Sequence, residues 1–488
     1  MRTRFLTSLF ILLFFQPLSA EYLKLTDEGA SFELMGYIDI LEDPDNELTF
    51  GQISSKEFSD QFVRHHENLN FGITSSTIWM RLTLANKSSL DQWLLELDNP
   101  NINQVFFYTP ENGRYIPQKT GAEITFDKRG GDYRNFIFRI MPDQHPTTYY
   151  VSLQSDFPLK IPAFIHQPEA YAEKENGTFI LFLVYLAITL FIIVINVIYF
   201  FSLQDRIYLF YCGAAFAMIG GIAMISGFAF KYVWPGFPGF NLYASSLFVF
   251  VSVYFITGFV RKLLLANRFA PVWDKIAFYY QHLMIPLSFL AAFQLMNIKT
   301  LNFLSYFANH LSIIILVAIG IQALRHKYKP AITYFIGFMG LALGSTIFIL
   351  DYENVIENPL GFFVICIGSV WEMVFFMAAM ATRQKVLQNE EMNKLKLDYD
   401  EKVEKMIENN GEGEEEYPPL PDHFQQLSPR EKEVLQCIAK GMTDQEIADA
   451  LSISKSTVKT HTRRIYGKLL VSNRTKAIAV ANKYGLIS

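Results

Sequence analysis

The 488-residue sequence predicts a multidomain protein: an all-β sandwich, then a bundle of seven transmembrane helices, then a short helical connector and an all-α, four-helix helix-turn-helix domain. Three observations predict this order. Charged residues make up 18% of the chain but are rare between Thr178 and Thr382, as expected of membrane-spanning segments. Short stretches before this block alternate between apolar and polar residues, as strands do, and the residues after it carry repeated helix caps. This composition excludes a plain cytosolic enzyme.

Residues 1–20 predict a cleavable signal peptide. Arg2 and Arg4 precede an apolar run from Phe5 to Phe15 that is too short to span a bilayer, and small residues follow up to Ala20. The alternative is an uncleaved amphipathic anchor. A signal peptide places residues 21–175 outside the cytoplasm. That domain contains no cysteine, so the sequence predicts neither a disulfide nor a cysteine-based zinc site there.

The exported domain is predicted to be a β-sandwich of short strands separated by turns. The clearest strand, 78–84, places Ile78, Met80, Leu82 and Leu84 on one face and Trp79, Arg81 and Thr83 on the other. Further strands are expected at 93–97, 105–108 and 149–153.

Two features of this domain resemble sites but are assigned structural roles. Trp79 and Trp93 are expected in the core rather than as sugar-stacking platforms. His65-His66-Glu67 is expected to be a solvated loop, because neighbouring residues on a strand point to opposite faces and cannot share a metal ion. The sequence predicts no metal site and no cofactor.

The apolar block divides into seven spans of about the length that crosses a bilayer. The spans are 178–201, 207–230, 241–260, 276–296, 302–324, 331–350 and 360–382. The connections expected inside the cell, together with the end of the last span, carry Arg206, Arg261, Lys262, Arg268, Lys275, Arg325, Lys327, Lys329, Arg383 and Lys385, whereas the outer connections carry Lys231 and Lys299. The positive-inside rule therefore predicts a multi-pass protein of the inner membrane with a cytoplasmic carboxyl terminus.

Four polar residues within the spans are candidates for function, because polar groups are costly in a bilayer. They are Glu372, His282, His310 and Asn196. Counting along the helices places Glu372 and His282 at similar depth, so a contact between them is compatible with the sequence. We weigh a switchable polar network against simple interhelical hydrogen bonding, and favour the latter. The seventh span contains no lysine, which excludes a retinal Schiff base on that helix.

After the last span, residues 383–408 are rich in helix formers and predict a connector helix. Its heptad track comprises Gln388, Met392, Leu395, Tyr399, Lys402 and Met406, and is compatible with a weak coiled coil or with a single solvated helix. Residues 409–426 are acidic and rich in glycine and proline, and predict a flexible linker.

Residues 427–488 are basic and contain clear helix signals. Ser428 and Thr443 each begin a capping box, Ser454 caps a third helix, and a fourth helix begins near Asn473. Apolar residues recur at helical spacing in each segment. Two short helices joined by a tight turn at Ser452-Ile453, the second carrying many cations, form a helix-turn-helix.

The string LSPREKEVLQCIAKGMTDQEIADALSISKSTVKTHTRRIYGKLLVSNRTKAIAVANKYGLI resembles the DNA-binding domain of LuxR/FixJ-type regulators over nearly its whole length. The resemblance implies that the third helix enters the major groove, with Lys459, Thr460 and Arg463 at base edges and Ser456, Thr457 and Arg464 near phosphates. Lys455 and Thr443 are weaker candidates. One departure is Leu470, where the family usually has glycine. In the family the fourth helix often pairs two domains, so the resemblance also implies a homodimer when active.

The upstream part, with IWMRLTLANKS and WLLELDNP before seven spans, resembles bacterial seven-transmembrane receptors with diverse intracellular signalling modules. The resemblance implies a periplasmic jelly-roll-like sandwich that binds a small ligand such as a carbohydrate. The sequence contains none of the enzymatic output motifs of that family, so we expect no enzyme but a membrane-bound sensor and transcription regulator. Two alternatives are a helix-turn-helix that serves as a protein adaptor, and a transporter, which is disfavoured because the spans show no repeat.

Overall fold

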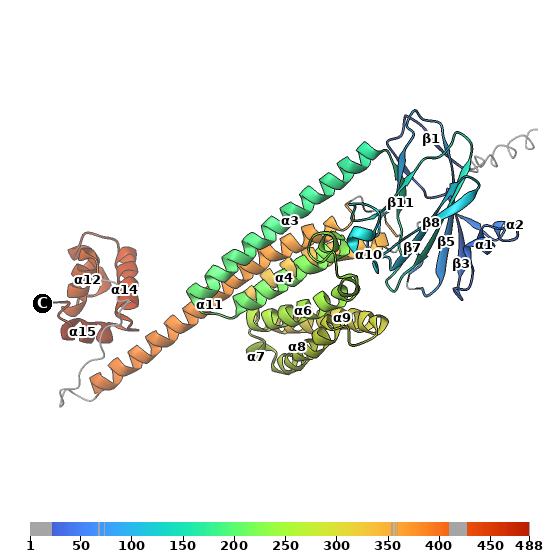
Figure 1. The fold of residues 1–488 in the computed structure, drawn as a ribbon. Helices are drawn as coiled ribbons and strands as arrows, with labels where there is room; N and C mark the ends of the chain where they lie inside the picture. Colours follow the sequence, from blue (N-terminus) through green and yellow to red (C-terminus); the bar gives the residue numbers. More distant parts are fainter. Residues whose placement is uncertain are drawn as a thin grey trace, which may run out of the picture. The chain divides into compact units, whose positions relative to one another are not determined.

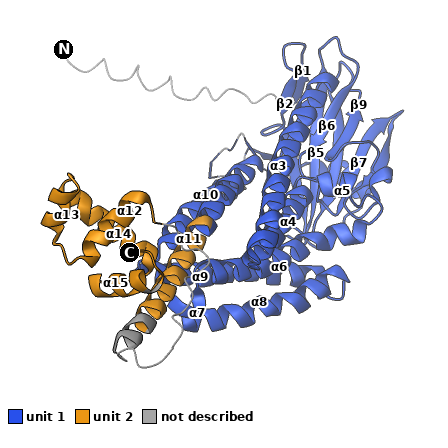
Figure 2. Cartoon of the chain, turned by 90° about the vertical axis from the view of Figure 1, so that its left-hand side faces the viewer, with its two compact units in different colours: residues 1–380 blue, residues 381–488 orange. Residues whose placement is uncertain are grey.

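The computed structural model describes residues 22–66, 69–72, 74–352, 355–356, 358, 360–408 and 427–487. The predicted signal peptide and acidic linker lie outside the described residues. The chain divides into two compact units, 1–380 and 381–488, coloured separately in Figure 2. The first unit contains the β-domain and the membrane helices, and the second contains the connector and the carboxyl-terminal helices.

The amino-terminal domain is built from two β-sheets (Figure 1). Its strands are β1 (Leu23–Leu25), β2 (Ser31–Glu33), β3 (Ile38–Asp43), β4 (Val63–His65), β5 (Thr77–Asn86), β6 (Trp93–Leu97), β7 (Gln104–Glu111), β8 (Arg114–Thr120), β9 (Phe136–Ile140), β10 (Thr147–Gln154) and β11 (Ala163–His166). The large sheet has the order β4-β3-β5-β10-β7-β8, with β1 parallel to β5, and the small sheet has the order β2-β11-β6-β9. Short helices α1 (Phe50–Ile53), α2 (Lys56–Ser59) and η1 (Phe126–Lys128) lie in the connections.

The alternation of apolar and polar residues along β5 matches the two faces of the large sheet. Ile78, Met80 and Leu82 are buried in the main core between the sheets, together with the fully buried Trp93. Trp79 lies on the opposite face, in a smaller apolar cluster that includes Ile53 of α1. The predicted strands and the core positions of both tryptophans are confirmed.

Two local features of the β-domain follow from backbone chemistry. Asn112 and Gly113 adopt φ values of 49° and 75°, so they form the left-handed turn that joins β7 to β8. His65-His66-Glu67 was expected to be a solvated loop, which is wrong for His65: it ends β4 and pairs with Ile38 of β3, while His66 is exposed after the strand and Glu67 lies outside the described residues. The described residues contain no cluster that could hold a metal ion.

Seven helices occupy the predicted spans. They are α3 (Pro168–Leu203), α4 (Ile207–Ile225), α6 (Pro238–Leu263), α8 (Pro271–Ala292), α9 (Ile298–Arg325), α10 (Lys329–Tyr352) and α11 (Phe363–Glu408). Within the described residues, all of these except α8 are long and apolar enough to cross a membrane. The polar side chains of α8, including Gln281 and His282, lower its mean hydropathy, so composition supports six of the seven predicted spans.

Several boundaries differ from the sequence prediction, those of α3, α4 and α11 among them. α3 begins at Pro168, ten residues before the predicted apolar span. Its first turns are polar, so hydropathy alone did not include them in the span. α4 ends at Ile225, since Gly227 adopts φ 81° and turns the chain into the short helix α5 (Phe228–Tyr232). α11 runs without a break from the last span into the connector, and the short helix α7 (Ala266–Phe269) lies between α6 and α8.

The carboxyl-terminal domain, residues 427–487 (here the head), contains four helices with a common apolar core. They are α12 (Pro429–Ala439), α13 (Asp444–Ala450), α14 (Lys455–Leu469) and α15 (Arg474–Lys483). The predicted inward residues Val434, Ile447, Val458 and Ala477 are all fully buried. The four-helix prediction is therefore confirmed.

Candidate nucleic-acid interface

Two capped helices and a tight turn form the helix-turn-helix. The backbone N–H of Thr443 donates to the Glu446 carboxylate at 2.7 Å, and this capping box starts α13. The Ser454 hydroxyl accepts a hydrogen bond from the N–H of Thr457 at 3.1 Å and starts α14. Between the helices, Ser452 adopts a left-handed φ of 53°. Thr443, a weaker candidate for DNA contact, therefore has a structural role as a helix cap.

One face of α14 packs inward and the other is open to solvent. Val458, Ile465 and Leu469 are fully buried against the rest of the head. The opposite face exposes the predicted contact residues Lys455, Ser456, Lys459, Thr460, Arg463 and Arg464, while Thr457 is half-buried. The structure thus brings the candidate residues of α14 together on one side of the helix.

The cations and the hydroxyls on this face differ in their contacts. Among the residues that the structure describes, the side chains of Lys459 and Arg463 form no ion pair or hydrogen bond. The Thr460 hydroxyl donates to the carbonyl of Ser456 at 3.0 Å, as is common for threonine in helices. The cations are therefore available to an external anion or base, whereas this hydroxyl must rotate away from its own helix to donate elsewhere.

A contact that sequence reasoning missed holds α14 against α12. Glu431 accepts the backbone N–H of Ser428 at 2.7 Å and the ammonium of Lys468 on α14 at 2.7 Å. Burial alone would raise the pKa of Glu431, but the hydrogen bonds from Lys468 and Ser428 outweigh it and lower the pKa to about 2. The capping box was visible in the sequence, but the Lys468 partner lies on another helix and was not.

A second missed contact joins the connector helix to the head within the same unit. One carboxylate oxygen of Asp400, on α11, accepts the N–H of Ser472 at 3.1 Å, and the other accepts the Lys476 ammonium of α15 at 3.0 Å. Tyr399, predicted on the coiled-coil track, is instead buried in the apolar core of the head. Gln388, Met392 and Leu395 of that track are exposed, while the side chains of Lys402 and Met406 lie outside the described part of the chain. We refer to the Tyr399 and Asp400 contacts as the connector clamp.

The four intramembrane candidates do not form one network. Glu372 is buried, whereas His282 and His310 are exposed and their ring nitrogens contact carbonyls of their own helices, at 2.7 Å each. The side chain of Asn196 is fully buried and its amide donates to the Ile192 carbonyl at 2.8 Å. Because His282 faces away from the packed interior that holds Glu372, the contact considered between them is not formed.

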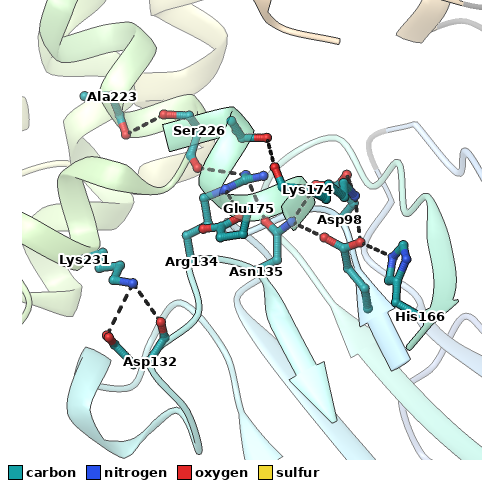
Figure 3. Close-up of polar contacts among 12 residues, drawn as sticks. Asp98, Asp132, Arg134, Asn135, His166, Lys174, Glu175, Ala223, Ser226 and Lys231 are labelled. Atoms are coloured by element: carbon teal, nitrogen blue, oxygen red, sulfur yellow. Dashed lines mark hydrogen bonds and ion pairs between the residues drawn. The ribbon is translucent and has the colours of Figure 1, made fainter. Parts of the chain in front are cut away.

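A polar network that no local sequence signal revealed connects the β-domain to α3 and to the end of α4 (Figure 3). Arg134, which is 4% exposed, donates to Glu175 of α3 at 2.9 Å and to the backbone carbonyl of Ser226 at 3.1 Å. Burial would lower the pKa of Arg134, but Asp98 and Glu175 outweigh it and raise the pKa, so the guanidinium stays charged. We call this the Arg134 junction.

The same network continues into the small sheet (Figure 3). Glu96 is fully buried and is contacted by His166, Lys174 and Asn135 at 2.7 Å each. Burial would raise the pKa of Asp98, but attraction by Lys174 and Arg134 lowers it below its ordinary value. Charges from the sandwich and from the first membrane helix therefore compensate one another.

Comparison with known families agrees with this architecture. The 7TMR-DISM extracellular 2 family matches residues 35–167, and the family described as 7TM diverse intracellular signalling matches residues 178–383. The luxR family of bacterial regulatory proteins matches residues 425–481. The chain carries a 7TMR-DISM sensor joined to a luxR-family domain. Both resemblances drawn from the sequence are thereby confirmed, and the matched families are receptor and regulatory types rather than enzymes.

Curated relatives of the luxR-family domain are regulators. The chain is 46% identical over 71 residues to the uncharacterized transcriptional regulatory protein YhcZ of Bacillus subtilis, covering 14% of this chain and 33% of that protein. It is 47% identical over 64 residues to the response regulator protein VraR of Staphylococcus aureus and of Staphylococcus epidermidis, covering 13% of this chain and 31% of each relative. The chain thus spans about a third of the length of these relatives.

The departure from the luxR-family pattern at Leu470 has a defined geometry. Leu470 ends α14 in the left-handed region, with φ 56° and ψ 32°, and its N–H bonds to the Tyr466 carbonyl. Glycine adopts this conformation without the steric cost that a β-carbon brings. The leucine side chain is 7% exposed and packs in the head core, so apolar burial offsets the backbone strain and the luxR-type fold is retained.

Proposed function

We propose that the protein is a membrane-bound, one-component signal receptor that regulates transcription by sequence-specific DNA binding. The observation that carries this proposal is the asymmetry of α14. Its apolar face is fully buried, and its opposite face exposes cations that have no partner among the described residues. Helix-turn-helix domains use such a face to enter the major groove.

The side chains on this face fit two kinds of DNA contact. Lys459 and Arg463 can donate to guanine O6 and N7, and Thr460 can contact a base or a thymine methyl group, each good base contact contributing roughly 1–3 kcal/mol of discrimination. Ser456, Thr457 and Arg464 are assigned to phosphates, which supply affinity rather than sequence preference. Lys455 and Thr443 are assigned weaker contacts at the edge of the same surface.

The proposed location is the inner membrane, with the β-domain in the periplasm and the head in the cytoplasm. The distribution of Lys and Arg among the connections supports this topology. The β-domain then senses a small ligand and the membrane helices transmit the signal. The output depends on pairing two heads, because engaging two half-sites together raises occupancy far above that of one head.

The connector clamp supports a specific form of this mechanism. Asp400 holds the start of α15, and α15 is the helix that the family resemblance assigns to pairing of two domains. A signal that changes the connector therefore acts directly on the helix that pairs the heads. We infer that release or rearrangement of the clamp changes the fraction of paired heads.

DNA binding by residues 381–488 tests the proposal, since this unit is compact and contains its own core. Genomic fragments are to be bound at about 50 and 200 mM salt, a range over which phosphate contacts weaken steeply. The double variant Lys459→Ala/Arg463→Ala should lose selective binding. The matched control, Lys432→Ala/Lys440→Ala, removes two exposed cations near α12 and should retain it.

Two outcomes count against DNA reading. Equal loss in both double variants would indicate only nonspecific attraction to DNA. Full transcriptional output in cells from Lys459→Ala/Arg463→Ala would favour the alternative in which the head is an adaptor for another regulator. If the monomeric head binds weakly, a version fused to a dimerising coiled coil should restore selective binding.

A further inference from the structure

Glu372 is a buried carboxyl group in the membrane part of α11, and the proposed function gives it no role. Between Phe363 and Thr382 it is the only Asp, Glu, Lys or Arg, and it is 9% exposed. Among the residues that the structure describes, its side chain forms no hydrogen bond and no ion pair. Interhelical hydrogen bonding, the role favoured from the sequence, therefore gives no reason for a carboxyl group at this position.

Aromatic rings from three other helices lie one turn away from Glu372. Phe376, four residues later on α11, has its ring centroid 6.4 Å from that of Tyr211 on α4 and 5.6 Å from that of Tyr334 on α10. The ring centroid of Phe259 on α6 lies 5.2 Å from that of Phe376. Because residues four apart share a helix face, Glu372 lies on the side of α11 against which α4, α6 and α10 pack.

The fourth neighbouring helix is α3. Ser369, three residues before Glu372, is hydrogen-bonded through its hydroxyl to the hydroxyl of Tyr185 on α3 at 3.3 Å. Ser369 is fully buried, and Tyr185 is buried as well. Since residues three apart also share a helix face, Glu372 lies where α11 packs against α3 too. The carboxyl group is therefore on the inner side of α11, which explains its burial.

The described groups around this carboxyl group carry no compensating charge. The hydroxyls of Tyr211 and Tyr334 are buried and have no hydrogen-bond partner among the described residues, and both tyrosines interact electrostatically with Glu372. Arg261 of α6 is bound instead to Asp274 of α8, at 2.8 Å. The titratable side chains that interact with Glu372 or with its tyrosine neighbours are of types that are uncharged near about pH 7, namely Tyr185, Tyr211, Cys212, Tyr334 and Cys366.

An ionised carboxylate is costly in these surroundings, because the bilayer interior and neutral side chains offset little of its charge. A proton or a metal cation would remove this cost. A metal cation prefers several oxygen ligands, and the described part of the chain contains no cluster of acids, histidines or cysteines that could hold one. A proton needs only one oxygen of Glu372, so the arrangement favours a proton.

The helices beside Glu372 differ in how far protein encloses them. In the most apolar stretch of α3 22% of the residues are buried and in that of α10 17%, compared with 50% for both α4 and α11. α3 and α10 can therefore move away from α11 at lower cost than α4 can, since they lose fewer packing contacts. Such a movement would admit water to Glu372 and allow its proton to leave.

We propose that Glu372 is a proton-binding site of the seven-helix bundle, protonated when α3 and α10 pack against α11 and ionised when they move apart. The proton comes from water and returns to it, so one O–H bond forms or breaks and no other reactant takes part. Because α11 continues to Asp400 of the connector clamp, the movement would also reach the head. That last consequence rests on the proposed function, whereas proton binding does not.

Infrared spectroscopy of the full chain in lipid nanodiscs tests the site, because a protonated carboxyl group has a carbonyl band that an ionised one lacks. Ordinary carboxyl groups are ionised above about pH 6, so a band that remains there comes from a shielded acid. We expect this band at about pH 6, its reversible loss by about pH 10, and its absence in Glu372→Gln. The matched control Glu391→Gln removes an exposed carboxylate from the same helix and should retain the band.

Thermal unfolding of the same samples supplies a second measurement. The protonated carboxyl group is the form favoured in the packed bundle, so the melting temperature of the native chain should fall as the pH rises from about 6 to about 9. Glu372→Gln resembles the protonated acid and should remove that fall, whereas Glu391→Gln should keep it.

Four results would overturn the assignment. The first is a band that persists at about pH 10, from a permanently bound proton, and the second is a band already missing at about pH 6, from a carboxylate with another partner. The third is a band unchanged in Glu372→Gln. The fourth is a melting temperature that rises with NaCl but not with choline chloride at fixed pH, which would assign the site to sodium. Residues 381–488 lack Glu372, so failure of this site would leave their DNA binding intact and the two proposals fail separately.

Discussion

Replacing Asp400 with asparagine removes the charge that the connector presents to α15 while keeping an oxygen for the N–H of Ser472. The lost interaction is the 3.0 Å ion pair between Asp400 and Lys476. The side chain of Lys476 is 7% exposed and that of Asp400 is 17% exposed. Hydrogen bonds between charged groups contribute about 1.5–3 kcal/mol when shielded from water. The residual exposure of Asp400 places the expected loss near the lower end, at about 2 kcal/mol.

This loss can be measured by urea unfolding of residues 381–488, followed by circular dichroism. Asp400→Asn should lower the free energy of unfolding by about 2 kcal/mol, which corresponds to a roughly thirtyfold weaker clamp. The control variant Glu391→Gln removes an exposed carboxylate from the same helix and should change the free energy of unfolding by less than about 0.5 kcal/mol. Combining Asp400→Asn with Lys476→Met should give less than the sum of the single effects.

The clamp also predicts a pH dependence of defined sign. Burial would raise the pKa of Asp400, but hydrogen bonds from Ser472 and Lys476 outweigh it and lower the pKa below its ordinary 3.8. A depressed carboxyl pKa stabilises the folded state above the ordinary value, and this contribution is lost as the pH falls through the depressed value. The difference between the native chain and Asp400→Asn should therefore begin to shrink as the pH falls below about 3.8, and should vanish only below the depressed pKa of Asp400. Additive single effects, or a difference that persists in acid, would refute the clamp.

Three further predictions concern other contacts. Glu431→Gln should destabilise the head by roughly 1–3 kcal/mol at neutral pH, and the difference should shrink as the pH falls from about 4.5 towards 2, measured by urea unfolding. Leu470→Gly should relieve about 1 kcal/mol of backbone strain but lose roughly 1.5–3 kcal/mol of apolar burial, giving net destabilisation; a raised melting temperature would contradict this. Arg134→Met should destabilise the full chain by roughly 3–5 kcal/mol in a thermal-shift assay, and adding Glu175→Gln should recover part of that loss.

The sequence predicts most reliably what neighbouring residues decide. The helix boundaries of the head follow from Ser428, Thr443, Ser454 and Asn473, whose side chains satisfy N–H groups within three residues. The two faces of β5 likewise follow from the alternation of apolar and polar residues over 80–84 in one strand. In both cases the interaction that fixes the structure is local, so the pattern can be read without knowing the fold.

Contacts between distant segments left no comparable signal. Arg134 and Ser226 are 92 positions apart, and Asp400 and Lys476 are 76 apart, so neither pair could be recognised by spacing. Tyr399 fitted a heptad track that would face a second copy of the chain, but its side chain is instead buried in the apolar core of the head of the same chain. His282 and Glu372 shared a predicted depth, yet depth does not define which side of a helix a residue faces. The rotation of each helix depends on its neighbours, which one sequence does not specify.

The strengths of the polar contacts bear on how a signal is passed. Moving a two-state equilibrium from about 1:99 to 99:1 requires about 5.5 kcal/mol of difference between the states. The ion pair between Asp156 of the β-domain and Lys299 of α9 is partly exposed, with Lys299 58% open to solvent, and such pairs contribute at most about 1 kcal/mol. The Arg134 junction is buried, and removing one of its partners would cost more, roughly 3–5 kcal/mol, because the other charge would be left unpaired. A signal that acts through Lys299 alone would therefore shift the equilibrium only about fivefold, whereas a rearrangement of the buried Arg134 junction would shift it further. Hydrogen exchange at Ser226 and Gly227 on ligand addition distinguishes the two cases, because protection there must change if the junction takes part.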